Sequence, residues 1–269
     1  MTAKIHIEHV WKWYDTAGER RSVLEEIDVA VEDQEFLCLL GPSGCGKTTV
    51  LNMIAGLLAP SQGAIRIDGR AVAGPGPDRA YVFQEHALFP WMTVLDNVAF
   101  GLESRGLPLA ESRTLARSLL GSLGLGDFCD YYPRRISGGM RQRVNLARAL
   151  AVNPDIILMD EPFAALDAQT RYTLHQELLA IWQILRKTIV FVTHNIDEAM
   201  LLADRIVLLT ARPARVKAVV PIRLRRPRDE ADPDYVALRK TVFRFVAEEM
   251  DRSLTAVSGE LAALLGRRG

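Results

Sequence analysis

Short apolar runs dominate the first part of the chain. Between residues 4 and 40 they are separated by turn residues, and the last run, 36–40, is apolar throughout. Such runs predict strands leading into whatever follows residue 40. From residue 48 to 58 the apolar positions recur at helical spacing, and the Ala-Pro-Ser-Gln-Gly sequence at 59–63 ends that pattern. A buried strand therefore turns almost directly into a helix.

The rest of the chain alternates between the two periodicities. A stretch from about 95 to 148 has helical spacing broken by glycine and proline, which predicts a helical insertion. Continuous apolar runs on either side of a helix then follow, as in parallel strands covered on both faces. These patterns favour an α/β fold. The further strands predicted are 64–69, 80–83, 156–159 and 188–192, and the clearest helices are 109–123, 141–150, 170–186 and 235–265.

Composition narrows the class of protein. Of 269 residues, 49% are apolar and 25% charged, which excludes a disordered or fibrous chain. Lys and Arg balance Asp and Glu at 33 each, so no global charge favours nucleic acid or an anionic membrane. The N-terminus lacks the apolar segment of a signal peptide, and no apolar stretch is long enough for a membrane helix. We expect a chain that is neither secreted nor membrane-spanning.

The three cysteines, Cys38, Cys45 and Cys129, have no C-x-x-C spacing. An odd number without that spacing suits a reducing compartment and argues against a disulfide framework or a zinc site.

A glycine-rich loop stands between the strand at 36–40 and the following helix. Its spacing is that of a P-loop, in which backbone N–H groups curl round phosphates, a lysine adds charge at the β- and γ-phosphates, and a hydroxyl holds Mg²⁺. The alternative is a glycine-rich turn that only reverses the chain. The segment reads Gly41, Pro42, Ser43, Gly44, Cys45, Gly46, Lys47, Thr48, and Thr49 follows it.

Cys45 lies in this loop at a helix N-terminus, where a thiolate is stabilised. One hypothesis is a reactive thiol whose alkylation blocks nucleotide binding, and the other is an inert small residue in a tight loop.

Two carboxylates follow the apolar run 156–159. Asp160 and Glu161 would lie at the carboxyl end of a strand, where ligands bind in α/β sheets. Asp160 would contact the Mg²⁺ shell and Glu161 would polarise the attacking water, since phosphoryl transfer needs mainly positioning and charge neutralisation. The alternative is acidic residues that end a strand and cap the next helix.

A second anion-binding surface is predicted at residues 137–143. Ser137 is a good N-cap, and Gly138 and Gly139 expose N–H groups at the positive end of the helix dipole. Taken alone, this segment is equally an ordinary helix start.

Together these segments resemble the nucleotide-binding subunit of an ATP-binding cassette (ABC) transporter. Walker A is residues 41–48, the signature is Ser137-Gly138-Gly139, and Walker B is 156–161. Gln84 matches the Q-loop glutamine, residues 165–167 match the D-loop, and His194 matches the switch histidine. Tyr14 matches the aromatic residue that stacks on adenine, although Trp11 and Trp13 lie nearby. One departure is Met140 where the family has glutamine, which removes polar contacts at that half-site.

The resemblance implies a RecA-like P-loop core with a mainly parallel sheet, an N-terminal antiparallel β subdomain and an inserted α-helical subdomain. It implies an ATPase domain over 1–220, with its core at 1–86 and 155–220 and the insertion at about 87–154, and a helical tail at 221–269. ATP and Mg²⁺ are the implied cofactors, with Thr48, Gln84 and Asp160 at the metal. Glu161, His194, Gln84 and Lys47 would be catalytic.

The family works as a pair of cassettes, so Ser137, Gly138 and Gly139 would contact the ATP held by a second copy or a homologous cassette. The resemblance further implies membrane permease subunits, an indirectly associated solute-binding protein, no nucleic acid, and a peripheral position on the cytoplasmic face of the inner membrane.

The segment after Gln84, from Glu85 and His86 to Val98, is similar to cassettes of nitrate, sulfonate and taurine importers through its Pro90-Trp91 pair. Alternatively Trp91 is core packing, because loop aromatics usually bury themselves. The basic stretch 212–227 is either a solvated surface or a contact with lipid headgroups or an acidic partner.

Rival functions are a soluble ABC ATPase acting on DNA or ribosomes, a non-hydrolysing module and an exporter. The first normally has two cassettes or long insertions and a nucleic-acid footprint, and this chain has none of these. The second would lack Lys47 or Glu161, and both are present. The Pro90-Trp91 pair and the absence of fused membrane helices disfavour the third.

Overall fold

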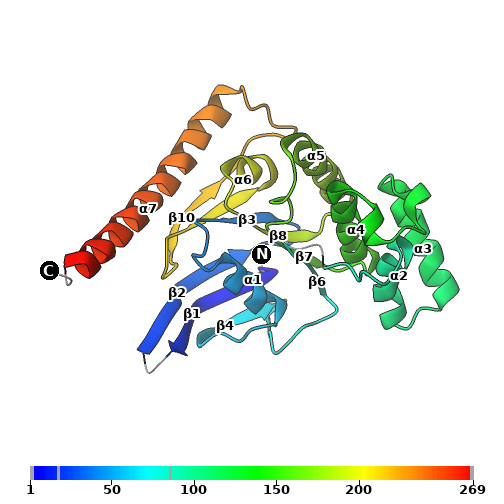
Figure 1. The fold of residues 1–269 in the computed structure, drawn as a ribbon, viewed down its shortest axis with the longest axis horizontal. Coiled ribbons are helices and arrows are strands. Elements are labelled where there is room, and N and C mark those ends of the chain that lie inside the picture. The colour runs from blue at the N-terminus through cyan, green and yellow to red at the C-terminus, as the bar shows by residue number, and fades with distance from the viewer. Residues whose placement is uncertain (1–2, 17–18, 85–86, 267–269) are drawn as a thin grey trace. The chain divides into compact units, whose positions relative to one another are not determined.

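The computed structural model describes residues 3–16, 19–84 and 87–266. The chain divides into two compact units, unit 1 (residues 1–74 and 192–269) and unit 2 (residues 75–191). Each unit contains both strands and helices, which confirms the predicted α/β class (Figure 1).

Unit 1 carries an antiparallel sheet with strand order β2-β1-β4-β5. Two buried isoleucines at the start of β1 pair with isoleucines of β4, with Ile5 opposite Ile67 and Ile7 opposite Ile65. This sheet fits the antiparallel β subdomain that the family resemblance implies. Its strands are β1 (Ile5–Thr16), β2 (Glu19–Val31), β4 (Gln62–Ile67) and β5 (Arg70–Ala71).

The second strand layer of unit 1 centres on β3, which is buried along its whole length and pairs in parallel with β9. β10 continues the sheet on the other side of β9, antiparallel to it. Helix α1 follows β3 after the glycine-rich loop, and α7 is the long helix that ends the chain (Figure 1). The bounds are β3 (Phe36–Leu40), β9 (Arg205–Leu209), β10 (Val216–Pro221), α1 (Lys47–Ala55), α6 (Ile196–Leu202) and α7 (Pro233–Gly266).

Unit 2 contains the strands β6 (Arg79–Val82), β7 (Ile156–Asp160) and β8 (Thr188–Thr193), whose last two residues belong to unit 1. β6 and β7 pair in parallel, with Tyr81 opposite Leu158 and Val82 opposite Met159. The helices are α2 (Val94–Ser104), α3 (Leu109–Ser122), α4 (Gly138–Ala151) and α5 (Ala168–Leu185), with short 3₁₀ turns at Gly126–Phe128 and Pro133–Arg135.

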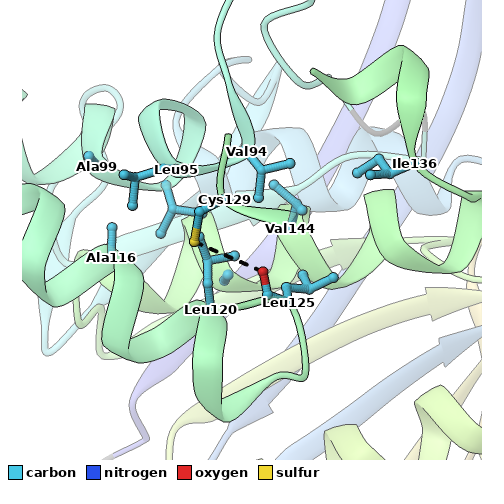
Figure 2. Close-up of a cluster of buried hydrophobic side chains, with 11 residues drawn as sticks. Val94, Leu95, Ala99, Ala116, Leu120, Leu125, Cys129, Ile136 and Val144 are labelled. Carbon is cyan, nitrogen blue, oxygen red and sulfur yellow. Dashed lines mark hydrogen bonds between the residues drawn. The ribbon is translucent and has the colours of Figure 1, made fainter. Parts of the chain in front are cut away.

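Helices α2, α3 and α4 share a small hydrophobic core of their own (Figure 2). Val94, Leu120 and Val144 are fully buried there, one from each helix. Cys129 lies in the same cluster, and its thiol is 4.0 Å from the carbonyl oxygen of Leu125 (Figure 2). The predicted helical insertion therefore buries its own apolar faces.

Several elements were not predicted. Helix α6 has only seven residues, too few for a helical period to stand out, and it is started by Asn195, whose side chain accepts bonds from the N–H groups of Asp197 and Glu198. Strand β10 lies within the basic stretch 212–227, where the sequence pattern predicts no strand. In that stretch Arg215 pairs with Glu25 and Arg226 with Asp204.

Within the described residues, we find no helix with the length and apolarity needed to traverse a lipid bilayer.

The core of α2, α3 and α4 gives a stability prediction. Replacing the fully buried Leu120 with alanine should lower the free energy of unfolding by about 2–5 kcal/mol, because the cavity in this small core has few neighbours to close it. Leu115→Ala on the same helix, 47% exposed, is the control and should cost about 0.5 kcal/mol or less. Denaturant unfolding followed by circular dichroism measures both. Equal losses for the two variants would contradict the assigned core.

Candidate functional site

The glycine-rich loop joins the buried strand β3 to helix α1. Gly46 has φ +121°, a value that residues with a side chain rarely adopt, and a Cβ there would lie 2.6 Å from Leu24 of β2. Gly44 also has positive φ. The loop conformation thus requires glycine at two of its predicted positions. Ser43, Gly44 and Thr48 are exposed, whereas Gly41, Cys45, Gly46 and Lys47 are buried and Pro42 and Thr49 are half-buried.

Lys47 is the first residue of α1 and only 4% exposed. Its ammonium donates hydrogen bonds to the carbonyl oxygens of Gly41 and Pro42, at 2.8 and 2.9 Å. A buried charge needs such partners, and both come from the loop that the lysine is predicted to serve. The ammonium therefore lies across its own loop, beside exposed N-terminal positions of α1.

Cys45 is 1% exposed. Burial is the main influence on its thiol and raises the pKa above its ordinary value, although the nearby Lys47 acts in the opposite direction. The helix terminus does not produce the lowered pKa that the reactive-thiol hypothesis needs. The structure therefore favours the inert alternative for Cys45.

The loop carrying His194 is held by buried polar contacts in unit 1. The hydroxyl of Thr193 donates to Glu198 at 2.5 Å and accepts from the backbone N–H of Asn195 at 3.0 Å. Thr193 and Glu198 are buried, while His194 is exposed. His194 is therefore not a core histidine. Among the histidines that the structure describes, the buried one is His175.

The same helix start lies close to the strand that leads into the glycine-rich loop. Cys38 of β3 has its pKa raised, first by complete burial and then by the carboxylate of Glu198, while Lys47 lowers it. Glu198 and Lys47 therefore act on one thiol from two elements of unit 1. This brings the His194 segment and the glycine-rich loop to the same strand.

In unit 2, Asp160 and Glu161 lie at the carboxyl end of β7, as predicted. Asp160 is buried, and the hydroxyl of Tyr81 on the neighbouring β6 donates to it at 3.3 Å. Burial, followed by the charge and hydrogen bond of Asp160, raises the pKa of Tyr81, so the phenol remains a donor. Glu161 is partly exposed and has φ +41°, a left-handed conformation uncommon in residues other than glycine. Such backbone costs about 1–3 kcal/mol and clusters at functional sites.

Gln84 and Glu161 lie at the same edge of this strand pair. Val82 is opposite Met159 in the parallel ladder, so the two residues are each two positions beyond a matched pair. Gln84 is exposed, and the ring of Phe83 stacks on that of Tyr81 with centroids 4.3 Å apart. The neighbouring Glu85 and His86 are outside the described residues.

The segment at 137–139 begins α4, as predicted. The hydroxyl of Ser137 accepts a hydrogen bond from the backbone N–H of Met140 at 3.3 Å, which confirms the N-cap. Gly138 and Gly139 are half-exposed, and a Cβ on Gly139 would lie 2.6 Å from the Thr170 methyl group on α5. The side chain of Met140 packs against the core of α2, α3 and α4. The methionine thus gives an apolar contact where a glutamine would give a polar one.

Two further predicted positions are exposed. Asp167 of the D-loop segment caps α5 by accepting from the backbone N–H of Thr170 at 2.9 Å, and that bond lowers its pKa. Tyr14 on β1 is 46% exposed with the Lys12 ammonium 5.1 Å from its ring centroid, whereas Trp11 and Trp13 are half-buried. Of the three aromatics, Tyr14 offers the most accessible ring.

Comparison with known proteins decides the family. A family model described as ABC transporter matches residues 24–164, more than half of the chain. This chain belongs to the ABC transporter family. As an ATP-binding subunit of that family it binds ATP and is an ATPase.

Relatives and solved structures agree with the ABC assignment. An uncharacterized ABC transporter ATP-binding protein of Methanocaldococcus jannaschii is 50% identical over 94% of this chain and 95% of its own length. The bicarbonate transport ATP-binding protein CmpD of Synechocystis is 44% identical over 91% of this chain and 89% of its own length. The nitrate import ATP-binding protein NrtD of Synechocystis is 47% identical over 80% of this chain and 81% of its own length. A dimeric post-hydrolysis ATP-binding cassette bound to ADP and phosphate matches with TM-score 0.73 and 32% identity, covering 82% of this chain and 100% of its own.

Sequence reasoning missed the residues that hold the ABC motifs in place. Tyr81, Thr193 and Glu198 have no phosphate-binding role to predict, yet they contact Asp160 or fix the loop of His194. The sequence could have pointed to Tyr81, because residues 81 and 83 lie on the same face of a strand that leads to Gln84. Nothing in the sequence pointed to Glu198, since an acidic residue in a first helical turn is ordinary.

The pKa of Cys45 gives a prediction about thiol chemistry. Only the thiolate attacks an alkylating agent or Ellman's reagent, so a buried thiol with raised pKa should react slowly at pH 7 and faster as the pH rises. The native protein should release little chromophore with Ellman's reagent, and the denatured protein should show all three thiols, because all are buried. Rapid labelling at pH 7, mapped to Cys45 by mass spectrometry, would restore the reactive-thiol hypothesis.

Proposed function

We propose that this ABC ATPase powers the import of a small oxyanion, with nitrate and bicarbonate first and aliphatic sulfonates or taurine next. The observation that carries the transporter assignment is an exposed aromatic cluster directly after Gln84. Trp91 is 70% exposed, so it is not the core packing residue that was the alternative. An exposed tryptophan in a family of transporter subunits supports a contact with a membrane permease.

The loop that presents Trp91 is held rigidly. Phe89 contacts both Trp91 and Phe100, with ring centroids 5.6 and 4.9 Å apart. The buried side chain of Asn97 accepts from the backbone N–H of Phe89 at 2.8 Å and donates to the carbonyl oxygens of Phe89 and Met92. Because the loop is ordered before any partner binds, docking there costs less entropy. This favours a permanent docking surface over a chance exposed ring.

ATP hydrolysis follows from the residues at the strand ends. Lys47 would exchange its two carbonyl partners for the β- and γ-phosphates, and His194 would hold the γ-phosphate. Glu161 would accept a proton from the attacking water. The water oxygen then bonds to the γ-phosphorus while the bond between the γ-phosphorus and ADP breaks. Ser137, Gly138 and Gly139 of a second cassette would add hydrogen bonds to the same phosphate. Loss of the γ-phosphate removes those bonds, so the pair opens after hydrolysis.

Mg²⁺ is the metal that this donor set would accept. Thr48 offers an exposed hydroxyl, Asp160 a buried carboxylate and Gln84 an exposed amide oxygen, all hard oxygen ligands. Tyr81 donates to one carboxylate oxygen of Asp160, which orients the carboxylate. The ion would neutralise phosphate charge during transfer.

The choice of cargo rests on relatives. CmpD is named for bicarbonate transport and NrtD for nitrate import, and both anions are small and planar. A solute-binding protein would select the anion outside the cell, and this chain would act from the cytoplasmic face of the inner membrane. The rival is a soluble ABC ATPase without a permease, which would have no use for an exposed tryptophan on an ordered loop.

The first prediction concerns Glu161. Glu161→Gln should retain ATP affinity, lower turnover on the order of 100-fold or more, and trap an ATP-bound dimer, because the amide cannot accept the proton. Turnover, nucleotide calorimetry and light scattering with Mg-ATP measure these effects. Lys47→Ala serves as the matched control, since it should lose ATP affinity and form no such dimer. Parental turnover in Glu161→Gln would remove the carboxylate from this role.

The second prediction separates transport from hydrolysis. Trp91→Ala should leave ATP affinity unchanged and weaken permease binding by about 2 kcal/mol or more, roughly 30-fold. Cells lacking this chain, complemented with each variant, should recover uptake of labelled nitrate or bicarbonate with the parent and not with Trp91→Ala. Ile184→Ala, exposed on α5, is the control and should restore uptake.

The outcomes of the uptake assay discriminate among cargoes and functions. Restored uptake of taurine or a sulfonate alone would move the cargo to those anions. No permease in a pull-down of Glu161→Gln from solubilised membranes, with ribosomal or DNA-repair proteins in its place, would establish the soluble ATPase.

A further inference from the structure

The last helix, α7, has two apolar stripes with different surroundings. The inner stripe includes Tyr235 and Val242, which are buried in unit 1. The outer stripe is Val236, Phe243 and Met250, which are 36%, 56% and 56% exposed. Each stripe repeats every seven residues, so each runs along one face of the helix. The inner stripe packs on unit 1, whereas Phe243 and Met250 of the outer stripe are more than half exposed.

The outer stripe continues as a heptad pattern to the end of the helix. Val257 and Leu264 extend the seven-residue spacing. A second apolar series lies four residues after each stripe residue from Phe243 on, and it consists of Ala247, Leu254 and Leu261. Alternating steps of three and four between apolar positions over about four heptads are typical of a coiled coil. Lys240 is the polar residue at such a position, and a single polar seam residue fixes register.

We propose that the outer stripe of α7 binds the same stripe of a second copy of this chain, in an antiparallel two-helix coiled coil that forms without nucleotide. This contact is separate from the ATP-dependent pairing proposed above. It makes α7 a permanent connection between two cassettes.

Charge favours this partner and this direction. With Met250 level with Ala247 of the second copy, so that the two apolar seams interlock, Met250 lies near the two-fold axis and Arg244 lies within one turn of Asp251 of the second copy. A parallel pair would instead place Arg239 beside Arg244 of the second copy, two like charges at flanking positions. The charges beside the exposed stripe are balanced, Lys240 and Arg244 against Glu248 and Asp251, whereas an anionic lipid surface attracts a predominantly basic face.

The inner contacts leave the outer stripe available. Lys217 of β10 contacts both Glu248 and Glu249 at 2.8 Å, and Glu249 accepts from the backbone N–H of Ala211 at 3.1 Å. Arg239 pairs with Asp197 of α6 at 2.6 Å. These bonds fix the rotation of α7 about its axis on unit 1, so the stripe of Phe243 and Met250 is turned outward.

Cysteine cross-linking tests both the contact and its direction. In the antiparallel pair, Met250→Cys lies about 4 Å along the axis from its counterpart, whereas Phe243→Cys lies about 16 Å away. Oxidation or a short bis-maleimide, without nucleotide, should link Met250→Cys into dimers and leave Phe243→Cys unlinked. The three native cysteines are buried, so background is low. Ala237→Cys, exposed near the start of α7, lies about 35 Å along the axis from its counterpart, so it is the control and should not link. Linking of both Phe243→Cys and Met250→Cys would overturn the antiparallel direction.

Sedimentation without nucleotide tests the strength of the contact. The full chain should sediment as a dimer, and the double variant Phe243→Glu/Met250→Glu should have a dissociation constant at least tenfold higher. Ile184→Glu, 80% exposed on α5, should behave as the parent. A monomeric parent, with no cross-link through Met250→Cys, would overturn the proposal.

Two further measurements distinguish this contact from ATP-dependent pairing and from lipid binding. The double variant carrying Glu161→Gln should still dimerise with Mg-ATP, which shows that it folds and that the two contacts are independent. Binding of the parent to phosphatidylglycerol vesicles, abolished in the double variant, would identify a lipid surface as the occupant and refute the self-association.

Discussion

The glycine-rich loop is organised around one buried charge, the ammonium of Lys47. Its burial is tolerated because Gly41 and Pro42 supply carbonyl oxygens from the same loop. The chain enters α1 from this loop through Gly46, whose backbone conformation side chains rarely adopt. The contact of Gly46 with Leu24 on β2 then ties the loop to the antiparallel sheet, so the loop geometry rests on packing well outside the motif.

The predicted reactive groups share one design. His194 and Glu161 are accessible, whereas the residues next to them are buried and hydrogen-bonded: Thr193 with Glu198, and Asp160 with Tyr81. A buried polar pair has few alternative arrangements because an unpaired group would cost about 1–3 kcal/mol. The accessible side chain therefore starts from a fixed backbone. Such preorganisation would reduce the entropy that ATP binding loses in ordering the predicted site.

Much of the fold was readable from the sequence because its elements have strong periodicities. β3 and β7 are uninterrupted apolar runs, and α4 begins at a serine whose capping role follows from its position alone. The motif residues could be named as candidates because phosphate binding restricts residue type and spacing together. The supporting residues could not, since the bond of Glu198 to Thr193 and the packing of Met140 depend on tertiary contacts that spacing does not encode. For Trp91 the general tendency of aromatic side chains to be buried gives the wrong expectation. Its ring is exposed on a loop that the side chain of Asn97 holds in place.

Charged side chains of the segment from Arg228 to α7 attach it to α6 of unit 1. Arg228 donates to the carbonyl oxygens of Met200, Leu201 and Ala203, so it satisfies the last turn of α6. Burial is the main cause of the lowering of its pKa to about 10, which leaves it charged at neutral pH. The ion pair of Arg239 with Asp197 fastens α7 to the first turn of that helix. Helix α6 begins directly after the loop of His194, which is predicted to hold the γ-phosphate. Helix α7, which carries the outer stripe, therefore also supports that loop through its contact with α6.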